Sequence, residues 1–232
     1  MKYYLKEEFL HDNNAKNAGN KARNDVEEIV KREGYQSLVL SVDNWYEMGT
    51  LKAQLHKSKA IGQALNQLKQ GDELLIQFPM LHHSFFTTHH VKKAQKKGVK
   101  VNFIIHDLEA LRYINVENFP LKHKIRIQIQ ESGLLGAADG IIAHNPIMKS
   151  VLVDKGIAAD KIVSLGIFDY LIPNFQEKTG FTKNQPIIVA GNLAQEKAGY
   201  LYSLPAEPAY NLYGVGFDES RALENENYFG SF

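Results

Sequence analysis

The sequence contains no cysteine and no long apolar run. Without cysteine, a chain of 232 residues forms no disulfide framework and no thiolate zinc site. No apolar stretch approaches the roughly 20 residues needed to cross a bilayer. The N-terminal sequence MKYYLKEEF also lacks the apolar segment of a signal peptide. We therefore expect a cytoplasmic protein without a transmembrane segment.

An excess of charge of one sign is also absent. Lysine and arginine total 27 against 26 acidic residues, a formal net charge of +1. This balance argues against a nucleic-acid partner, which usually requires a strong positive bias. Apolar residues make up 44% of the sequence, which is enough for a buried core and excludes a disordered chain.

Short β-rich runs alternate with longer segments of helical periodicity. The predicted strands are Lys2–Leu5, Ser37–Asp43, Glu73–Phe78, Val99–Ile105 and Gly140–Ala143. Several of them are apolar at consecutive positions, which is typical of strands covered on both faces. The alternation predicts an α/β fold, a Rossmann-like doubly wound parallel sheet.

Helices are predicted between these strands. Apolar spacing indicates helices within 61–68 and 85–97, and Asn145 is a predicted N-cap for a helix that ends near Gly156. The isoleucines in 125–129 fit either a strand or a helix face. We predict a helix there, because a crossover must connect two parallel strands.

Composition divides the chain into three parts. Residues 1–171 hold the predicted Rossmann-like sheet, and residues 172–185 are polar and form a predicted linker. Residues 186–232 begin with another strand, turn and helix in QPIIVAGNLAQEK. We expect an incomplete second Rossmann-like domain there.

Polar residues follow several strands, where open parallel sheets bind their ligands. His106 and Asp107 follow the fourth predicted strand. His106 could donate to a substrate hydroxyl or phosphate, whereas Asp107 could instead cap a helix. His144 and Asn145 occupy the equivalent place after the fifth strand.

A long loop is predicted at residues 11–24, after the first strand. Gly19 permits a tight turn there, and Lys21 and Arg23 add positive charge, so backbone N–H groups could hold an anion. A surface loop in which Asn24 or Asp25 caps the next helix accounts for the same residues.

Two further motifs have a functional and a plain interpretation. The segment HHSFFTTHH holds His82 and His83, but its histidine pairs lie too far apart for metal ligands of one helix, so no metal site is predicted. A sugar contact by one of these histidines remains open. Asn192 and Lys197 follow the strand IIVAG and could cradle a diphosphate, or form a turn and an exposed lysine.

Several distinct motifs follow one another along nearly the whole chain. They are AGNKARND, FIIHDLEALR, LLGAADGIIAHNPIMKSVLVDKGI, KIVSLGIFDYL, VAGNLAQEKAGYLYSL and YNLYGVGF. Their combination resembles a family of bacterial sugar transferases. The family comprises glucosyltransferases of streptococci and lactobacilli that extend glycans on serine-rich repeat adhesins, and related galactofuranosyltransferases.

The resemblance implies a GT-B enzyme with an N-terminal acceptor-side domain and a C-terminal nucleotide-sugar domain. It implies metal-independent transfer of a hexose from a UDP-sugar to a glycan or glycosylated protein, with stabilisation of the leaving group as the main catalytic effect. No cofactor besides this donor is expected, and homo-oligomers are common in the family. Because the family continues past residue 232, the alternative is a truncated, non-catalytic module that binds carbohydrate or a partner glycosyltransferase.

The resemblance also implies roles for individual residues. The catalytic pair would be His106 and Asp107. The donor-binding residues would be Gly19, Lys21, Asn192, Lys197, Gly214 and Gly216. Position after the carboxyl ends of strands, and not the resemblance, gives the predicted acceptor-side residues, which are Arg112, His82 and His83.

Overall fold

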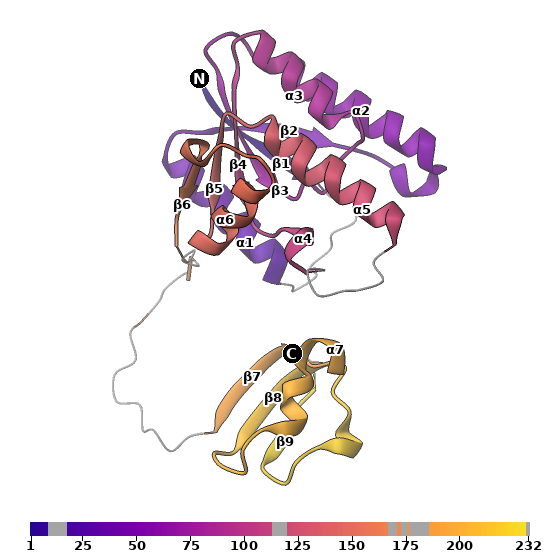
Figure 1. The fold of residues 1–232 in the computed structure, drawn as a ribbon, viewed down its shortest axis with the longest axis vertical. Helices are drawn as coiled ribbons and strands as arrows, with labels where there is room; N and C mark the ends of the chain where they lie inside the picture. The colour runs from indigo at the N-terminus through magenta and orange to yellow at the C-terminus, as the bar shows by residue number, and fades with distance from the viewer. Residues whose placement is uncertain (9–17, 113–119, 167–170, 173–175, 177–185, 231–232) are drawn as a thin grey trace. The chain divides into compact units, whose positions relative to one another are not determined.

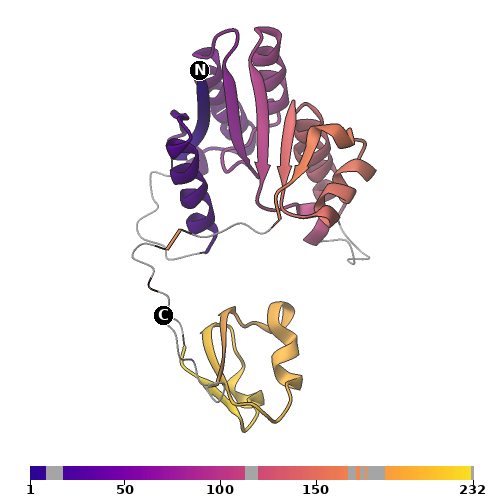
Figure 2. The same ribbon diagram turned by 90° about the vertical axis from the view of Figure 1, so that its left-hand side faces the viewer.

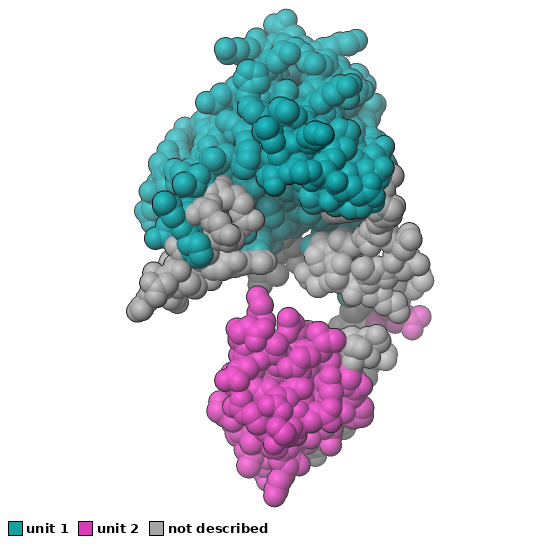
Figure 3. All heavy atoms as spheres, turned by 90° about the vertical axis from the view of Figure 1, so that its right-hand side faces the viewer, with its two compact units in different colours: residues 1–172 teal, residues 173–232 magenta. Residues whose placement is uncertain are grey.

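The computed structural model describes residues 1–8, 18–112, 120–166, 171–172, 176 and 186–230. The chain divides into two compact units, Met1–Ile172 (unit 1) and Pro173–Phe232 (unit 2) (Figure 3). Each unit is described by itself.

Unit 1 is built on a six-stranded parallel sheet (Figure 1). Its strands are β1 (Lys2–Glu8), β2 (Gln36–Ser41), β3 (Glu73–Phe78), β4 (Lys100–Ile105), β5 (Gly140–Ala143) and β6 (Ile162–Ser164). Their order in the sheet is β2-β1-β3-β4-β5-β6, and every pair is parallel. The chain therefore winds outward in both directions from β1 and β3, which makes this strand pair the topological switch point where such sheets bind ligands.

Helices connect these strands (Figure 2). They are α1 (Ala18–Arg32), α2 (Thr50–Asn66), α3 (Thr87–Lys96), α4 (Glu109–Arg112), α5 (Leu121–Ile127), which continues as a π-helix η2 (Gln128–Leu135), and α6 (Pro146–Asp154). Right-handed crossovers place α1 on one face of the sheet and α2 and α3 on the other. The larger core cluster includes Ile61 of α2 and Val91 of α3, and a smaller cluster packs Val26 of α1 on Leu75.

Unit 2 contains a three-stranded parallel sheet among its described residues. The strands β7 (Ile187–Asn192), β8 (Tyr210–Val215) and β9 (Glu226–Tyr228) lie in sequence order, and a short helix, α7 (Gln195–Ala198), follows β7. Its small core is formed by Leu193, Ala198, Leu201, Tyr210 and Leu212. In the described part of the chain, no helix combines the length and the apolar character needed to span a membrane.

The structure confirms the predicted α/β class and several elements. The helix predicted at 125–129 is present, and the side chain of Asn145 caps α6 by accepting a hydrogen bond from the Met148 amide at 2.9 Å. The three-residue strand β6 was not predicted, because Ile162 is its only buried residue.

The loop predicted at residues 11–24 is wrong where the structure describes it. Helix α1 begins at Ala18, so Gly19 lies in a helical turn, and neither Asn24 nor Asp25 is a cap. Alanine, lysine, arginine and glutamate favour helix throughout this segment, and Val26 buries its side chain against the sheet.

Candidate functional site

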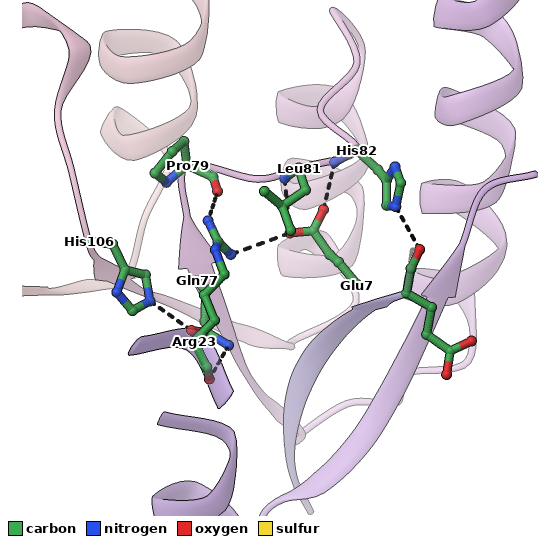
Figure 4. A network of polar contacts seen from close by, with 8 residues as sticks. Glu7, Arg23, Gln77, Pro79, Leu81, His82 and His106 are labelled. Atoms are coloured by element: carbon green, nitrogen blue, oxygen red, sulfur yellow. Dashed lines mark hydrogen bonds and ion pairs between the residues drawn. The ribbon is translucent and has the colours of Figure 1, made fainter. Parts of the chain in front are cut away.

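The candidate site lies at the carboxyl edge of the parallel sheet, beside the switch point. Glu7, near the end of β1, has a side chain that is only 5% exposed. Its carboxylate accepts hydrogen bonds from the amides of Leu81 at 3.0 Å and His82 at 2.8 Å (Figure 4). Glu7 thus holds the turn that follows β3 against the end of β1.

Arg23 of α1 is the charged partner of Glu7. One guanidinium nitrogen lies 3.8 Å from the Glu7 carboxylate, and another donates to the carbonyl of Pro79. Burial raises the pKa of Glu7 and lowers the pKa of Arg23. The charge of Arg23 partly offsets the rise at Glu7, and the charge of Glu7 partly offsets the fall at Arg23. A buried pair of this kind becomes costly when one partner is removed, so it fixes the geometry of the edge.

Hydrogen bonds of Gln77 in β3 connect Arg23 to His106, which follows β4. The Gln77 side-chain nitrogen donates to the Arg23 carbonyl at 3.4 Å, and its oxygen lies 2.7 Å from His106 Nε2. The amide oxygen is an acceptor, so Nε2 of His106 carries the proton. Burial, reinforced by the charge of Arg23, lowers the pKa of His106 to about 4, so its imidazole is neutral near pH 7.

A cavity of about 440 Å³ lies next to this network. The segment Phe78–Leu81 forms one wall, and Lys57, His83, Asp107 and Glu131 contribute polar groups to the others. Its volume falls in the range of small-molecule sites. The cavity therefore joins the loops after β3 and β4 with helix α2 in one binding-sized space.

His83 presents a polar atom to this cavity. Gln130 donates a side-chain N–H to Nδ1 of His83 at 3.1 Å, so the proton of the neutral ring is on Nε2. His83 is 8% exposed, and Nε2 has no hydrogen-bond partner among the described residues. Burial lowers its pKa to about 4. A buried N–H donor without a partner is costly, and a ligand acceptor would relieve that cost.

Lys57 and Glu131 supply opposite charges to the cavity walls. Lys57 is 6% exposed, and its ammonium lies 3.3 Å from the centre of the Trp45 ring, a cation–π contact. Burial lowers the pKa of Lys57. Glu131 is 2% exposed, accepts from the Ala110 amide at 3.1 Å and pairs with Lys155 at 3.1 Å. Mixed donors and acceptors around one space suit a ligand with several hydroxyl groups.

The structure separates the residues predicted for the acceptor and catalytic roles. His83 and Asp107 line the cavity together. His82 instead donates its ring N–H to the Glu8 carbonyl at 2.9 Å, and His106 binds Gln77. Arg112 ends α4, and its side chain lies outside the described residues. No group of three or more histidine or acidic side chains in the described ranges could hold a metal ion.

The residues predicted to bind the donor lie in different surroundings. In unit 1, the ammonium of Lys21 pairs with Asp25 at 2.5 Å and donates to the Leu171 carbonyl at 2.6 Å. In unit 2, the Asn192 side chain accepts from the Ala194 amide at 3.0 Å, and Lys197 is an exposed residue of α7.

The donor-side glycines bring two backbone segments unusually close. Gly214 lies within β8 and not in a turn, with φ of 153°, and a Cβ atom there would be 1.8 Å from the Gly191 carbonyl oxygen. Gly216, just after β8, has φ of 84°, and a Cβ there would meet Ala194 at 2.9 Å. Only glycine fits these positions without displacement of the backbone.

Sequence reasoning missed Glu7, Gln77, Lys57 and Glu131, and treated Arg23 only as loop charge. The predicted first strand ended at Leu5, which left Glu7 outside the sheet. A signal was available for Lys57, because a lysine at the helical spacing of Ala53, Ile61 and Ala64 falls on the buried face of α2.

Comparison with known proteins identifies relatives of this chain. Residues 2–167 match the family model described as Glucosyltransferase 3-like, N-terminal domain. The chain is 29% identical over 231 residues to Beta-1,6-galactofuranosyltransferase WbbI of Escherichia coli (strain K12). That alignment covers 97% of this chain and 61% of the relative, so the chain spans about three-fifths of the relative's length.

Solved glycosyltransferase structures share the fold. The apo form of the lipopolysaccharide outer core galactosyltransferase WaaB matches with a TM-score of 0.56 at 13% identity, over 100% of this chain and 68% of that one. HepE of Anabaena in complex with UDP-glucose matches with a TM-score of 0.50 at 11% identity, over 100% and 69%. These likenesses confirm the expected GT-B-type architecture at the level of the fold. With its family model matched along residues 2–167, the chain belongs to the glucosyltransferase 3-like family.

Proposed function

We propose that this chain is part of a glycosyltransferase that moves a hexose from a UDP-sugar to a glycan or glycosylated protein. Its membership of the glucosyltransferase 3-like family carries the proposal. The name of the WbbI relative states a galactofuranosyl transfer, and the HepE neighbour holds UDP-glucose, which both support a sugar-nucleotide donor.

In this proposal the unit 1 cavity receives the acceptor. Lys57 and the Nε2–H of His83 donate to acceptor hydroxyl groups, and Asp107 accepts from them. Carboxylate, ammonium and imidazole groups around a space of about 440 Å³ can satisfy several hydroxyls at once. His106 is neutral near pH 7, which suits a group that hydrogen-bonds to a substrate without adding charge.

Unit 2 binds the donor in the same proposal. Asn192 and Lys197 lie near the diphosphate, and Gly214 and Gly216 allow the nucleotide to approach the backbone. Protein groups then stabilise the leaving diphosphate without a metal ion. The transfer should therefore persist in EDTA. The homo-oligomer expected from the resemblance belongs to this proposal and is tested by light scattering.

Donor binding is tested by calorimetry of the purified chain with UDP. Lys197→Ala should weaken UDP binding by about tenfold, the usual size of a charge-assisted contact. Glu196→Ala, at the preceding position of α7, is the matched control and should leave the affinity unchanged. Equal affinities in both variants would contradict the role of Lys197, and no UDP binding at all would contradict donor binding by this chain.

Acceptor binding is tested separately by transfer from a labelled UDP-sugar to glycan acceptors. His83→Ala should raise the KM for the acceptor, because it removes a hydrogen-bond donor from the unit 1 cavity. It should leave UDP binding intact, because UDP is proposed to bind to unit 2. His89→Ala, an exposed histidine of α3, is the control. Binding of UDP and glycan without any labelled product would instead indicate a non-catalytic module.

A further inference from the structure

Two long segments of unit 1 contain no acidic residue. Residues 48–71 and 74–106 hold neither aspartate nor glutamate, although the whole chain has a net charge of only +1. The same segments contain lysines 52, 57, 59, 69, 92, 93, 96, 97 and 100, of which all but Lys57 are exposed. The positive charge of the chain is therefore concentrated in these segments, and the remainder is net acidic.

The fold gathers these segments on one face of the sheet. Helices α2 and α3 are in contact, and Ser58 of α2 lies 2.9 Å from Nε2 of His90 in α3. At the other end Lys97 donates to Asn66 at 3.1 Å. Helix α5, whose sequence LKHKIRI also lacks an acidic residue, continues as η2, which contacts α3. Figure 1 shows α2, α3 and α5 along the same side of unit 1.

Large apolar side chains are exposed at the start of each of these helices. They are Leu51 (70%), Leu55 (52%), Phe85 (50%), Phe86 (44%), Leu121 (71%) and Ile125 (52%). Crossover helices run antiparallel to the strands, so the first turns of α2, α3 and α5 all lie toward the carboxyl edge of the sheet. We define the basic face as the exposed residues of α2, α3 and α5 together with Phe85 and Phe86.

Glu47 and Asp139 are acidic groups that lie beside the basic face. Glu47 precedes α2 in a short 3-10 turn. Asp139, beside the end of α3, accepts hydrogen bonds from Gln95 at 2.9 Å and from the Val101 amide at 2.8 Å. Lysines at the far end of α3 and leucines at the start of α2 thus share a surface with little opposing charge.

We propose that the basic face docks onto an anionic lipid surface. Exposed lysines are attracted to anionic headgroups, and leucine and phenylalanine side chains can enter the boundary between headgroups and acyl chains. A nucleic acid would use the lysines but would give the aliphatic side chains no apolar environment. Arginine is the residue that most often contacts phosphates and bases in bidentate geometry, and the sequences of α2 and α3 contain none, whereas α5 contains one, Arg126. The proposal is independent of sugar transfer.

Co-sedimentation of the purified chain with vesicles tests the proposal. The chain should pellet with vesicles of phosphatidylcholine mixed with phosphatidylglycerol, and it should pellet weakly with phosphatidylcholine alone. Added salt should reduce the bound fraction, because exposed charges are screened. Lys92→Glu with Lys93→Glu should lower the affinity by about tenfold or more.

The matched control reverses two exposed lysines elsewhere on unit 1. Lys2→Glu with Lys31→Glu changes the net charge equally but leaves the basic face intact, and should keep most of the binding. Leu51→Ser with Leu55→Ser should weaken binding that survives high salt. Thermal unfolding checks that each variant folds.

Three outcomes would overturn the proposal. The first is equal sedimentation with neutral and anionic vesicles. The second is an equal loss in the control and the α3 variant, which would show a response to net charge alone. The third is binding to an RNA oligonucleotide that depends on Lys92 and Lys93 without any binding to anionic vesicles.

Discussion

The ends of the strands differ between the two units. In unit 1 they carry side chains such as Glu7, Gln77 and His106, joined in one buried network. In unit 2 the strands β7 and β8 end in glycine-containing backbone, where Gly191 and Gly214 leave no room for a side chain between them. The strand ends of unit 1 thus depend on contacts between side chains, whereas those of β7 and β8 depend on close backbone approach, and the two should respond differently to substitution.

The largest expected effect is in unit 2. Gly214→Ala would place a Cβ atom 1.8 Å from the Gly191 carbonyl oxygen, so β7 and β8 could not keep their pairing. We expect a loss of roughly 4 kcal/mol or more, which would unfold a unit with so small a core. Hydrogen exchange of the β7 and β8 amides would report it.

The Gly214→Ala experiment has two controls. The single tryptophan, Trp45, lies in unit 1, so its fluorescence should still report a folded unit 1. Gly230→Ala has φ of 76° but no atom within 4 Å of the added Cβ, so it should cost only about 1–2 kcal/mol. Slow exchange in the Gly214→Ala protein would contradict the close approach of the two strands.

The next effect tests the buried pair of unit 1. Arg23→Met leaves Glu7 without its charged partner, and we expect about 3–5 kcal/mol less stability in urea unfolding followed by Trp45 fluorescence. The double variant Arg23→Met with Glu7→Gln should lose less, because no unpaired charge remains. If both variants unfold at the same urea concentration, the pair does not hold the site together.

A smaller effect concerns the pH dependence of unit 1. The pKa of His83 is about 4, below its ordinary value of 6.5, so the unfolded chain takes up the proton first as the pH falls. The stability due to His83 is complete above pH 6.5 and is lost between pH 6.5 and 4. At pH 5 the loss should reach up to about 2 kcal/mol.

His83→Gln should remove that part of the pH dependence, since glutamine does not titrate. Urea unfolding at pH 7 and pH 5 measures the difference, with His89→Gln on exposed α3 surface as the control. A pH dependence unchanged by His83→Gln would show that acid acts elsewhere in unit 1.

The strands and helices of unit 1 were largely predictable, because the spacing of apolar residues and the capping residues within each segment determine them. The strand boundaries of β3 and β5 agree with the structure, since both are apolar runs that a parallel sheet buries. The Asn145 cap was predictable for the same reason: its hydrogen bond joins residues three positions apart. The first turns of helix α1 were predicted as a loop, because their glycine and asparagine residues have low helix propensity, although the rest of the segment is rich in helix formers.

The candidate site was less predictable because its contacts join distant positions. His83 and Asp107 were identified from their place after strands, and the structure lines one cavity with both. The roles of Glu7 and Arg23 could not be read in the same way, because their partners near Pro79 lie more than fifty positions along the chain. In unit 2 the glycines were identified by resemblance, but the contact between Gly191 and Gly214 depends on how β7 and β8 pair.

The carboxylate of Glu7 has a further consequence for how the protein is made. Its acceptor sites are filled by amides 74 and 75 positions later in the chain. At a synthesis rate of about 5–20 residues per second, the ribosome needs roughly 4–15 seconds to produce them. Until then strand β1 cannot bury the Glu7 carboxylate without leaving these acceptor sites unfilled, so the side chain must stay hydrated on the nascent chain. The same residue that orders the finished site therefore delays its closure until the turn after β3 has emerged.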